Sequence, residues 1–219
     1  MDNISLYEDI KARTGGEIYL GVVGPVRTGK STFIRRFMDL CVIPSILDPN
    51  EKKRIIDELP QAGVGKTVMT TEPKFIPKTG IEIPLSNNVK AKFRLIDCVG
   101  YIVDSAQGVY EDDKERLVKT PWFDENIPFS KAAQTGTEKV IRDHSTIGIV
   151  MTTDGSIGEF TRDDYISAEE KAIMELKKIK KPFIVIVNST FPASDFTRKI
   201  ANEISEKYEV TALPMDCEN

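Results

Sequence analysis

The segment that most constrains the fold of this chain is Gly24-Pro25-Val26-Arg27-Thr28-Gly29-Lys30-Ser31. It forms the pattern G-x-x-x-x-G-K-S between a predicted buried strand at 18–23 and a predicted helix at 31–42. The glycines let the backbone curl so that successive N–H groups point inward at an anion, and the following helix directs its positive dipole end at the same point. Because the pattern stands in this strand–helix context, we interpret it as a phosphate-binding loop for a nucleotide.

Two side chains of this loop have predicted chemical roles. Lys30 places a positive charge on the β- and γ-phosphates, and the hydroxyl of Ser31 is a ligand for Mg²⁺. Arg27 either reaches the γ-phosphate or lies exposed. The predicted nucleotide-binding residues of the loop and the helix start are Gly24, Arg27, Thr28, Gly29, Lys30, Ser31 and Thr32.

Apolar runs alternate with segments of helical periodicity along the rest of the chain. The predicted strands are 18–23, 92–96, 146–151, 183–187 and 210–214, with a further strand beginning near 74, and the predicted helices are 31–42, 51–59, 131–143, 162–180 and 194–208. Strands separated by helices form βαβ units with right-handed crossovers. The sequence therefore predicts an α/β fold of three layers, in which helices cover both faces of a mostly parallel sheet of about six strands.

The helical spacing also predicts which side chains are buried. In helix 31–42 the predicted apolar stripe is Phe33, Ile34, Phe37, Leu40 and Cys41. In helix 162–180 it is Tyr165, Ile166, Ala172, Ile173, Leu176 and Ile179. Two long polar stretches, 48–72 and 100–130, interrupt this regular pattern, and loops of such length in a compact domain are usually functional.

Composition excludes several classes of protein. The 219 residues carry 34 acids and 30 bases, a formal net charge of −4, which disfavours nucleic-acid binding by bulk charge. The longest apolar runs are about five residues, far below the ~18 that a membrane span needs. The N-terminal residues have no secretory pattern. Cys41, Cys98 and Cys217 are widely spaced, which suits a reducing cytosol, and with His144 they offer no zinc-site spacing.

A second part of the phosphate site is predicted at Asp97-Cys98-Val99-Gly100, where a buried strand ends. The D-x-x-G pattern places Asp97 beside the phosphate loop, where its carboxylate holds Mg²⁺ directly or through a water ligand. The backbone N–H of Gly100 is then available to a γ-phosphate. We expect Asp97 to complete the metal site that Ser31 begins.

A threonine is expected between these two motifs, where it closes over Mg²⁺ and the γ-phosphate only in the triphosphate state. Thr70 and Thr71 stand at the right place, and Thr67 is a rival. The order of phosphate loop, threonine and D-x-x-G is that of the GTPase-like (TRAFAC) arrangement. A second possible phosphate loop ending at Gly65-Lys66-Thr67 is dismissed, because Pro60 takes the place of the required earlier glycine and no strand precedes it.

The chain departs from the GTPase pattern at its base-recognition motif. A GTPase of this class carries Asn-Lys-x-Asp after the next long apolar strand, whereas this strand ends in Asn188-Ser189-Thr190-Phe191. Asn188 fits and remains a predicted nucleotide-binding residue. A phenyl ring cannot accept the two hydrogens that guanine presents at N1 and N2, and unpaired donors cost binding energy. Asp195 comes about a helical turn too late, so we expect adenine rather than guanine.

A second departure follows the D-x-x-G motif. Many GTPases have a glutamine there that orients the attacking water, but this chain has Tyr101. We expect hydrolysis to be slow, or to be completed by the threonines or by a neighbouring subunit. Gln107 is a weaker candidate for the same role, and His144 is expected to be a partner at a helix C-terminus rather than a catalytic group.

Together these residues resemble the stage IV sporulation protein A family, the morphogenetic ATPases at the base of the spore coat in endospore-forming bacteria. The resemblance covers essentially the whole chain, and shared loops such as Thr120-Pro121-Trp122 are far more specific than a phosphate loop. The other matching segments are 13–16, 18–31, 57–61, 65–67, 69–75, 97–101, 144–148 and 152–155.

The resemblance implies a domain descended from translation-factor GTPases that now binds and hydrolyses ATP. Lys30 matches the family's phosphate-loop lysine, Thr70 and Thr71 match its paired sensor threonines, and Asp97 matches the acid of its D-x-x-G. Hydrolysis in the family drives self-assembly into a stable shell at the outer forespore membrane, facing the mother-cell cytoplasm.

The resemblance also implies partners that lie beyond this domain. Members of the family continue into further domains, including a C-terminal region that meets the membrane and a small amphipathic partner. We therefore expect 1–219 to be the N-terminal ATPase domain of a longer chain. Its implied partners are other copies of itself and other spore coat morphogenetic proteins, with no nucleic acid.

Two other functions remain open from the residues alone. One is a nucleotide-gated switch protein that recognises a partner and turns over negligibly. The other is a P-loop kinase, which needs an arginine-bearing lid over its acceptor, and only scattered residues such as Arg116 are candidates for it.

Overall fold

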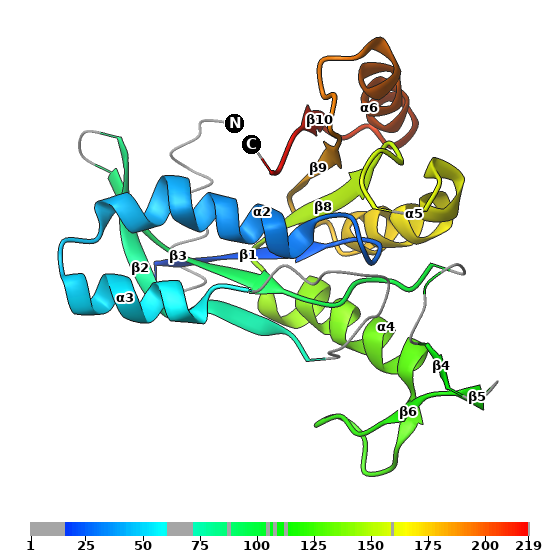
Figure 1. Cartoon of the computed structure of the whole chain (residues 1–219), viewed down its shortest axis with the longest axis horizontal. Coiled ribbons are helices and arrows are strands. Elements are labelled where there is room, and N and C mark those ends of the chain that lie inside the picture. Colours follow the sequence, from blue (N-terminus) through cyan, green and yellow to red (C-terminus); the bar gives the residue numbers. More distant parts are fainter. Residues whose placement is uncertain are drawn as a thin grey trace.

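The computed structural model describes residues 16–60, 72–86, 89–103, 106, 109–111, 114–158 and 160–218. Its centre is a six-stranded sheet with the order β10-β9-β8-β1-β3-β2 (Figure 1). The strands are β1 (Glu17–Val23), β2 (Lys74–Ser86), β3 (Val89–Asp97), β8 (Ile147–Thr153), β9 (Phe183–Asn188) and β10 (Ala212–Met215). β1 pairs in parallel with β3 and β8, and β9 pairs in parallel with β8 and β10. Only the edge strand β2 is antiparallel within the described sheet, so the predicted mostly parallel sheet is confirmed.

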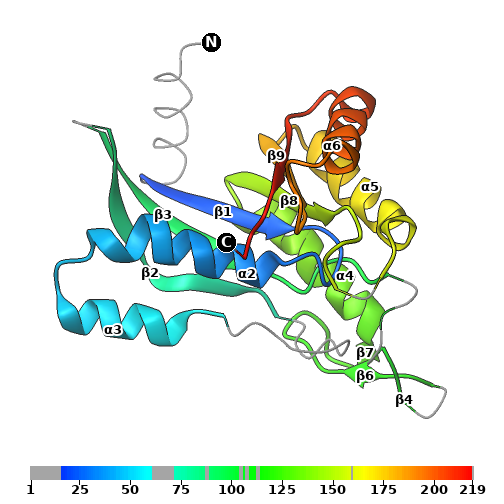
Figure 2. The same cartoon turned by 45° about the horizontal axis from the view of Figure 1, so that its top comes forward.

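Helices cover both faces of the sheet, as Figure 2 shows from a second direction. They are α2 (Lys30–Phe37), α3 (Pro49–Glu58), α4 (Phe129–Lys139), α5 (Arg162–Lys178) and α6 (Asp195–Tyr208). One apolar core joins α2 and α3 to alternate residues of β1, namely Ile18, Leu20 and Val22. The other core joins α4, α5 and α6 to the opposite face. The three-layer α/β prediction is therefore confirmed. None of the helices in the described part is both long and apolar enough to cross a bilayer.

The predicted stripe of helix 31–42 is wrong in its last turn. α2 continues as a π-helical turn, η1 (Met38–Val42), followed by a short 3₁₀ turn, η2 (Ile43–Ser45). A π turn contains more residues than an α turn. Val42 consequently takes the inward position that α-helical spacing assigns to Cys41, and Met38 and Val42 are buried whereas Leu40 and Cys41 are exposed.

The predicted stripe of helix 162–180 is also wrong at two positions. Ile166 and Ile179 are partly exposed, at 39% and 37%. The buried face follows the spacing of three and four residues from Tyr165 through Ala168, Glu169, Ala172, Ile173 and Leu176. Ile166 stands about 100° around the helix from Tyr165, and Ile179 follows the last helical residue.

The long stretch 100–130 contains two small antiparallel pairs of strands. β4 (Tyr110–Glu111) pairs with β5 (Lys114–Glu115), and β6 (Leu117–Val118) pairs with β7 (Ile127–Pro128). They project from the body of the domain beyond α4 (Figure 1). The guanidinium of Arg116 lies 4.2 Å from the centroid of the Phe129 ring, which attaches this projection to α4. α4 itself ends in a second π turn, η3 (Val140–His144), where the His144 ring contacts Phe75 edge-on.

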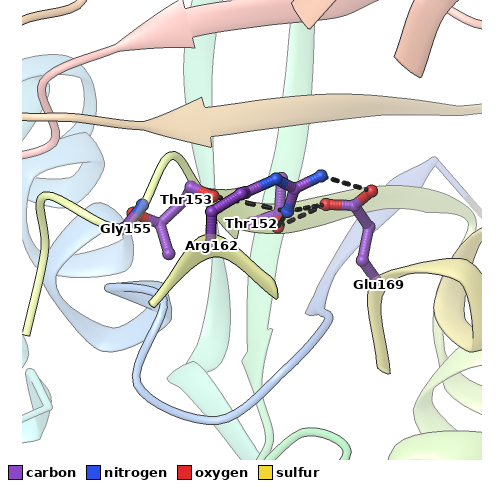
Figure 3. A network of polar contacts seen from close by, with 5 residues as sticks. All are labelled: Thr152, Thr153, Gly155, Arg162 and Glu169. Atoms are coloured by element: carbon purple, nitrogen blue, oxygen red, sulfur yellow. Dashed lines mark hydrogen bonds and ion pairs between the residues drawn. The ribbon is translucent and has the colours of Figure 1, made fainter. Parts of the chain in front are cut away.

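A buried ion pair joins the start of α5 to the end of β8 (Figure 3). Arg162 donates from Nη2 to Glu169 Oε1 (2.9 Å) and from Nη1 to Glu169 Oε2 (2.6 Å). Thr152 Oγ1 donates to the same Oε2 (2.6 Å), and Glu169 is only 2% exposed. Nothing in the sequence pattern predicted this pair, because Glu169 reads as an ordinary polar residue of an amphipathic helix.

We predict that Glu169→Ala lowers the free energy of unfolding by about 3 kcal/mol, because it leaves the Arg162 guanidinium without its buried carboxylate. Glu170→Ala is the matched control. Glu170 is the neighbouring residue, and its pair with Lys207 is exposed on both sides (47% and 56%), so its loss costs below ~1 kcal/mol. Denaturant titration of both variants measures the difference, and equal losses would contradict the prediction.

Candidate nucleotide-binding site

The predicted site residues gather at one edge of the sheet. β1, β3, β8 and β9 are parallel, so their carboxyl ends meet there. In open α/β sheets, ligands bind outside the carboxyl ends of the strands, at the point where the chain switches from one side of the first strand to the other. Here that point is β1, which has β3 on one side and β8 on the other. The phosphate loop follows β1 directly.

The phosphate loop is closed by its own hydrogen bonds. The carbonyl oxygen of Pro25 accepts from Thr28 Oγ1 (3.0 Å) and from the ammonium of Lys30. Gly29 caps α2 in the left-handed conformation, with φ 87°. Because the first N–H groups of any α-helix lack an acceptor within it, those of Lys30, Ser31 and Thr32 are donors for an anion at this end.

Ser31 and Asp97 form the metal corner of the site. Ser31 Oγ donates to Asp97 Oδ2 at 2.7 Å, which joins the start of α2 to the end of β3. The other oxygen, Asp97 Oδ1, is buried and accepts no hydrogen bond from the described residues. A hydroxyl beside an unsatisfied carboxylate oxygen suits Mg²⁺, which binds few protein oxygens and completes its shell with water and phosphate. These residues therefore fit the predicted ion.

Burial shapes the electrostatics of this corner. It raises the pKa of the Asp97 carboxyl, and the Ser31 hydrogen bond and the Lys30 charge oppose it only in part. Burial likewise lowers the pKa of the Lys30 ammonium, against the attraction of Cys98 and Asp97. Both charged forms are costly without a partner, so an anionic phosphate and a cation would stabilise them.

Gly100 and Tyr101 hold the phosphate loop from the β3 side. Tyr101 donates its N–H to the Gly24 carbonyl (3.0 Å), and Val26 donates its N–H to the Tyr101 carbonyl (2.9 Å). Gly100 has φ +96°, and a Cβ on it would lie 2.2 Å from the Gly24 carbonyl oxygen and 2.6 Å from Lys30 Nζ. Only glycine fits this position.

The side chain of Tyr101 points away from the site. Its ring is 2% exposed, and the Lys171 ammonium lies 4.9 Å from the ring centroid. In this conformation Tyr101 therefore packs in the apolar core, and the expected slow hydrolysis stays a prediction.

Asn188 holds the phosphate loop from the opposite side. Its Nδ2 donates to the Thr28 carbonyl (3.1 Å), and its Oδ1 accepts the N–H of Cys217 (3.1 Å). A Cβ on Gly29 would lie 2.3 Å from Asn188 Nδ2, which explains the second glycine of the motif. Asn188 thus braces the loop against β9 and β10, and its predicted contact with nucleotide stays a prediction.

A carboxylate that the sequence reasoning missed lies next to Asn188. Asp154 follows β8 and accepts from Ser156 Oγ (2.6 Å) and Thr197 Oγ1 (2.6 Å). Thr197 also bonds Ser189 Oγ at 3.2 Å. Burial raises the pKa of Asp154, but the hydrogen bonds from Ser156, Ser189 and Thr197 outweigh it and leave the pKa lowered. The available signal was an acid directly after a buried strand, the same signal that identified Asp97.

Of the remaining predicted residues, the structure describes Arg27 and Thr32. Arg27 is half-buried and has a positive φ of 64°, unusual for a residue other than glycine. Thr32 is half-buried in the first turn of α2. Thr67, Thr70 and Thr71, and the reserve candidate Gln107, lie outside the described residues.

The fold and the site together define the class of protein. A phosphate loop between β1 and α2, closed by Asp97 and Gly100 at the end of the neighbouring strand β3, is the arrangement of a P-loop nucleoside triphosphatase of the GTPase-like type. A crystal structure of an Era variant from Aquifex aeolicus with GDP·AlF₄⁻ has the same fold. It shares 16% identity and a TM-score of 0.50 with this chain, and the match covers 93% of this chain and 52% of Era.

Sequence comparison then shows the family. All 219 residues match the family described as "Stage IV sporulation protein A, ATPase domain", and the chain belongs to it. It is 56% identical over 214 residues to stage IV sporulation protein A of Clostridioides difficile (strain 630), with 98% of this chain covered. It is 50% identical over 219 residues to that of Bacillus subtilis (strain 168), with 100% covered. The chain spans 44% of the length of each of these relatives.

We predict that Gly100→Ala weakens ATP binding by about tenfold or more and lowers the free energy of unfolding by about 2 kcal/mol. The added methyl group must displace either the Gly24 carbonyl or Lys30. Gly80→Ala is the control, because its Cβ would meet only side-chain atoms, of Glu17 at 3.1 Å and of Lys92 at 3.2 Å, and no backbone atom within that distance. Calorimetric titration with ATP and denaturant unfolding measure the two effects, and unchanged affinity in Gly100→Ala would contradict the close packing described above.

Proposed function

We propose that this ATPase domain binds Mg²⁺–ATP at the phosphate loop and hydrolyses it to ADP and phosphate, and that hydrolysis drives self-assembly of the basement layer of the spore coat at the forespore surface. The observation that carries the proposal is the joined corner of Lys30, Ser31 and Asp97 in a chain of this family.

Each residue of the corner has a defined task in the proposal. The Lys30 ammonium gives up its hydrogen bond to the Pro25 carbonyl and bonds phosphate oxygens instead. The N–H groups at the start of α2 hold the same anion. Ser31 and Asp97 hold Mg²⁺, which when bound neutralises charge on the β- and γ-phosphates. Gly100 presents its N–H toward the γ-phosphate. Thr70 and Thr71 are the proposed sensors of that phosphate, and either of them or Thr67 completes the metal shell.

Adenine is the proposed base, because the sequence position of the aspartate that recognises guanine in GTPases is not a carboxylate here. Phe191 occupies that position, and both polar atoms of the Asn188 side chain are already bonded to the protein. The amide still has a second hydrogen to donate, but guanine N1 and N2 require acceptors.

The proposed partners follow from the family and not from contacts in this structure. They are second copies of the chain, other spore coat morphogenetic proteins, and a small amphipathic membrane-anchoring partner that binds regions outside these residues. The proposed location is the mother-cell cytoplasm, peripheral to the outer forespore membrane. The relatives' name, stage IV sporulation protein A, supports a role in sporulation.

A second candidate function is a nucleotide-gated switch with negligible turnover. The buried ring of Tyr101 favours it, because the residue after Gly100 does not reach a water at the phosphate site in this conformation. Measured turnover separates the two functions. The alternative of a kinase is excluded if phosphate is released without an added acceptor.

We predict that Lys30→Ala abolishes phosphate release from Mg²⁺–ATP and prevents ATP-dependent assembly. The substitution removes the buried ammonium, which is the main positive charge that contacts the transferred phosphate in this proposal. Released phosphate and sedimentation of assembled protein are measured with ATP and with GTP at equal concentrations. Lys199→Ala is the control, because this lysine lies on α6 with its side chain 74% exposed. A strong preference for GTP would contradict the interpretation that Phe191, in place of an aspartate, removes guanine recognition.

We predict that Thr70→Ala combined with Thr71→Ala lowers the rate of hydrolysis at least about 100-fold while ATP affinity changes less than about fivefold, because sensing of the γ-phosphate matters after binding. Single-turnover phosphate release and equilibrium ATP binding distinguish the two effects. Undiminished hydrolysis in the double variant would favour Thr67 instead.

A further inference from the structure

Strand order determines on which side of the phosphate loop a nucleotide extends. The loop follows β1, and Asp97 closes it from β3, so the metal and the terminal phosphate belong to the β3 side. The rest of a bound nucleotide must then extend over the ends of β8 and β9, on the other side of β1. The residues that follow Asn188 lie on that side.

Phe191 is within reach of this position. Asn188 is bonded to the phosphate loop itself through the Thr28 carbonyl. Phe191 follows three residues later, a span of at most about 10 Å. The phosphates of a nucleotide bound in the loop would therefore lie close enough to the Phe191 backbone for the nucleoside to span the distance.

The backbone of Phe191 is held on both sides. Its N–H donates to Ser189 Oγ (2.9 Å), and its carbonyl accepts from the Ser194 N–H (2.9 Å). Ser189 Oγ is in turn bonded to Thr197 Oγ1 (3.2 Å). Thr197 is in turn fixed to the buried carboxylate of Asp154. Three side-chain groups from three separate segments, the hydroxyls of Ser189 and Thr197 and the carboxylate of Asp154, therefore determine where this backbone stands.

The ring that this network positions is 71% exposed. It makes no ring–ring or cation–ring contact among the described residues. An exposed phenyl ring forgoes the stabilisation that burial would supply. A fixed backbone that carries an exposed apolar ring, three residues after the Asn188 that bonds the phosphate loop, offers a surface on which a flat ligand can stack.

We propose that the ring of Phe191 is the stacking surface for the nucleobase, and that Asp154, through Thr197 and Ser189, is a positioning residue for it. This inference rests on the proposed binding of ATP and names the residue that selects its base. A phenyl face stacks on a base without accepting a hydrogen bond, so it selects for the broad π-face of a purine over a pyrimidine. Discrimination against guanine comes separately from the missing carboxylate.

The test compares ATP with inorganic tripolyphosphate, which has the phosphates but no base. The affinities of the intact chain and of Phe191→Ala are measured for both ligands with Mg²⁺ present. We expect Phe191→Ala to bind ATP about 10- to 100-fold more weakly and tripolyphosphate within twofold of the original chain. Phe196→Ala is the matched control, because Phe196 is also exposed (60%) and stands nearby at the start of α6.

A fluorescent version keeps the proposal testable if the alanine variant is unstable. Phe191→Trp in a Trp122→Phe background retains ATP binding, and its single indole is quenched by ATP but not by tripolyphosphate. Asp154→Asn in the same background is expected to retain tripolyphosphate binding and to reduce the quenching, because the loop loses its anchor.

Several results would overturn the proposal. They are unchanged ATP affinity in Phe191→Ala, equal weakening of ATP and tripolyphosphate, equal weakening by Phe196→Ala, and bound ATP that leaves the indole at 191 unquenched. A Phe191→Ala chain that binds ATP normally but fails to assemble would assign the ring to a contact between copies instead. If the unaltered chain binds no ATP, the proposed function itself fails and this inference fails with it.

Discussion

The backbone of the phosphate loop is fixed by contacts on two sides, and the rest of the site depends on that constraint. From the β3 side, Tyr101 exchanges two backbone hydrogen bonds with it, and Gly100 lies so close that a methyl group would collide with the Gly24 carbonyl. From the β9 side, the Asn188 amide bonds its backbone. A change of conformation after Gly100 would therefore directly shift the backbone of the phosphate loop.

Buried charge concentrates at this same edge of the sheet. Burial shifts the pKa of Lys30 and Asp97 toward their neutral forms. Asp154 and Glu169 are buried as well, but hydrogen bonds and the Arg162 ion pair compensate their charges. Such groups add little net stability compared with apolar packing. Their concentration at the carboxyl ends of the strands suits the proposed binding of a phosphate and a cation. The two apolar cores, one on each face of the sheet, supply the stability of the fold.

Much of the fold could be predicted because its signals are local. Buried strands such as β9 are short apolar runs, and helices such as α6 show their period directly. The two π turns could not be predicted, since their extra residue per turn depends on how Met38 and Val42 pack against the sheet. Glu169 was missed for a related reason. A carboxylate becomes a core residue here only because Thr152 of β8 faces it together with Arg162, which lies two turns earlier in the same helix.

The sequence by itself determined the phosphate loop, the acid at the end of the next strand and the absence of a guanine-specific carboxylate, because each is a short pattern whose chemistry follows from adjacent residues. The tertiary structure alone decided what stands opposite them. Asp154 and Thr197 are 43 residues apart, and they meet because α6 packs against β9, the strand next to β8 in the sheet. Exposure of the Phe191 ring, like burial of Tyr101, is a property of packed strands and helices that no local pattern encodes.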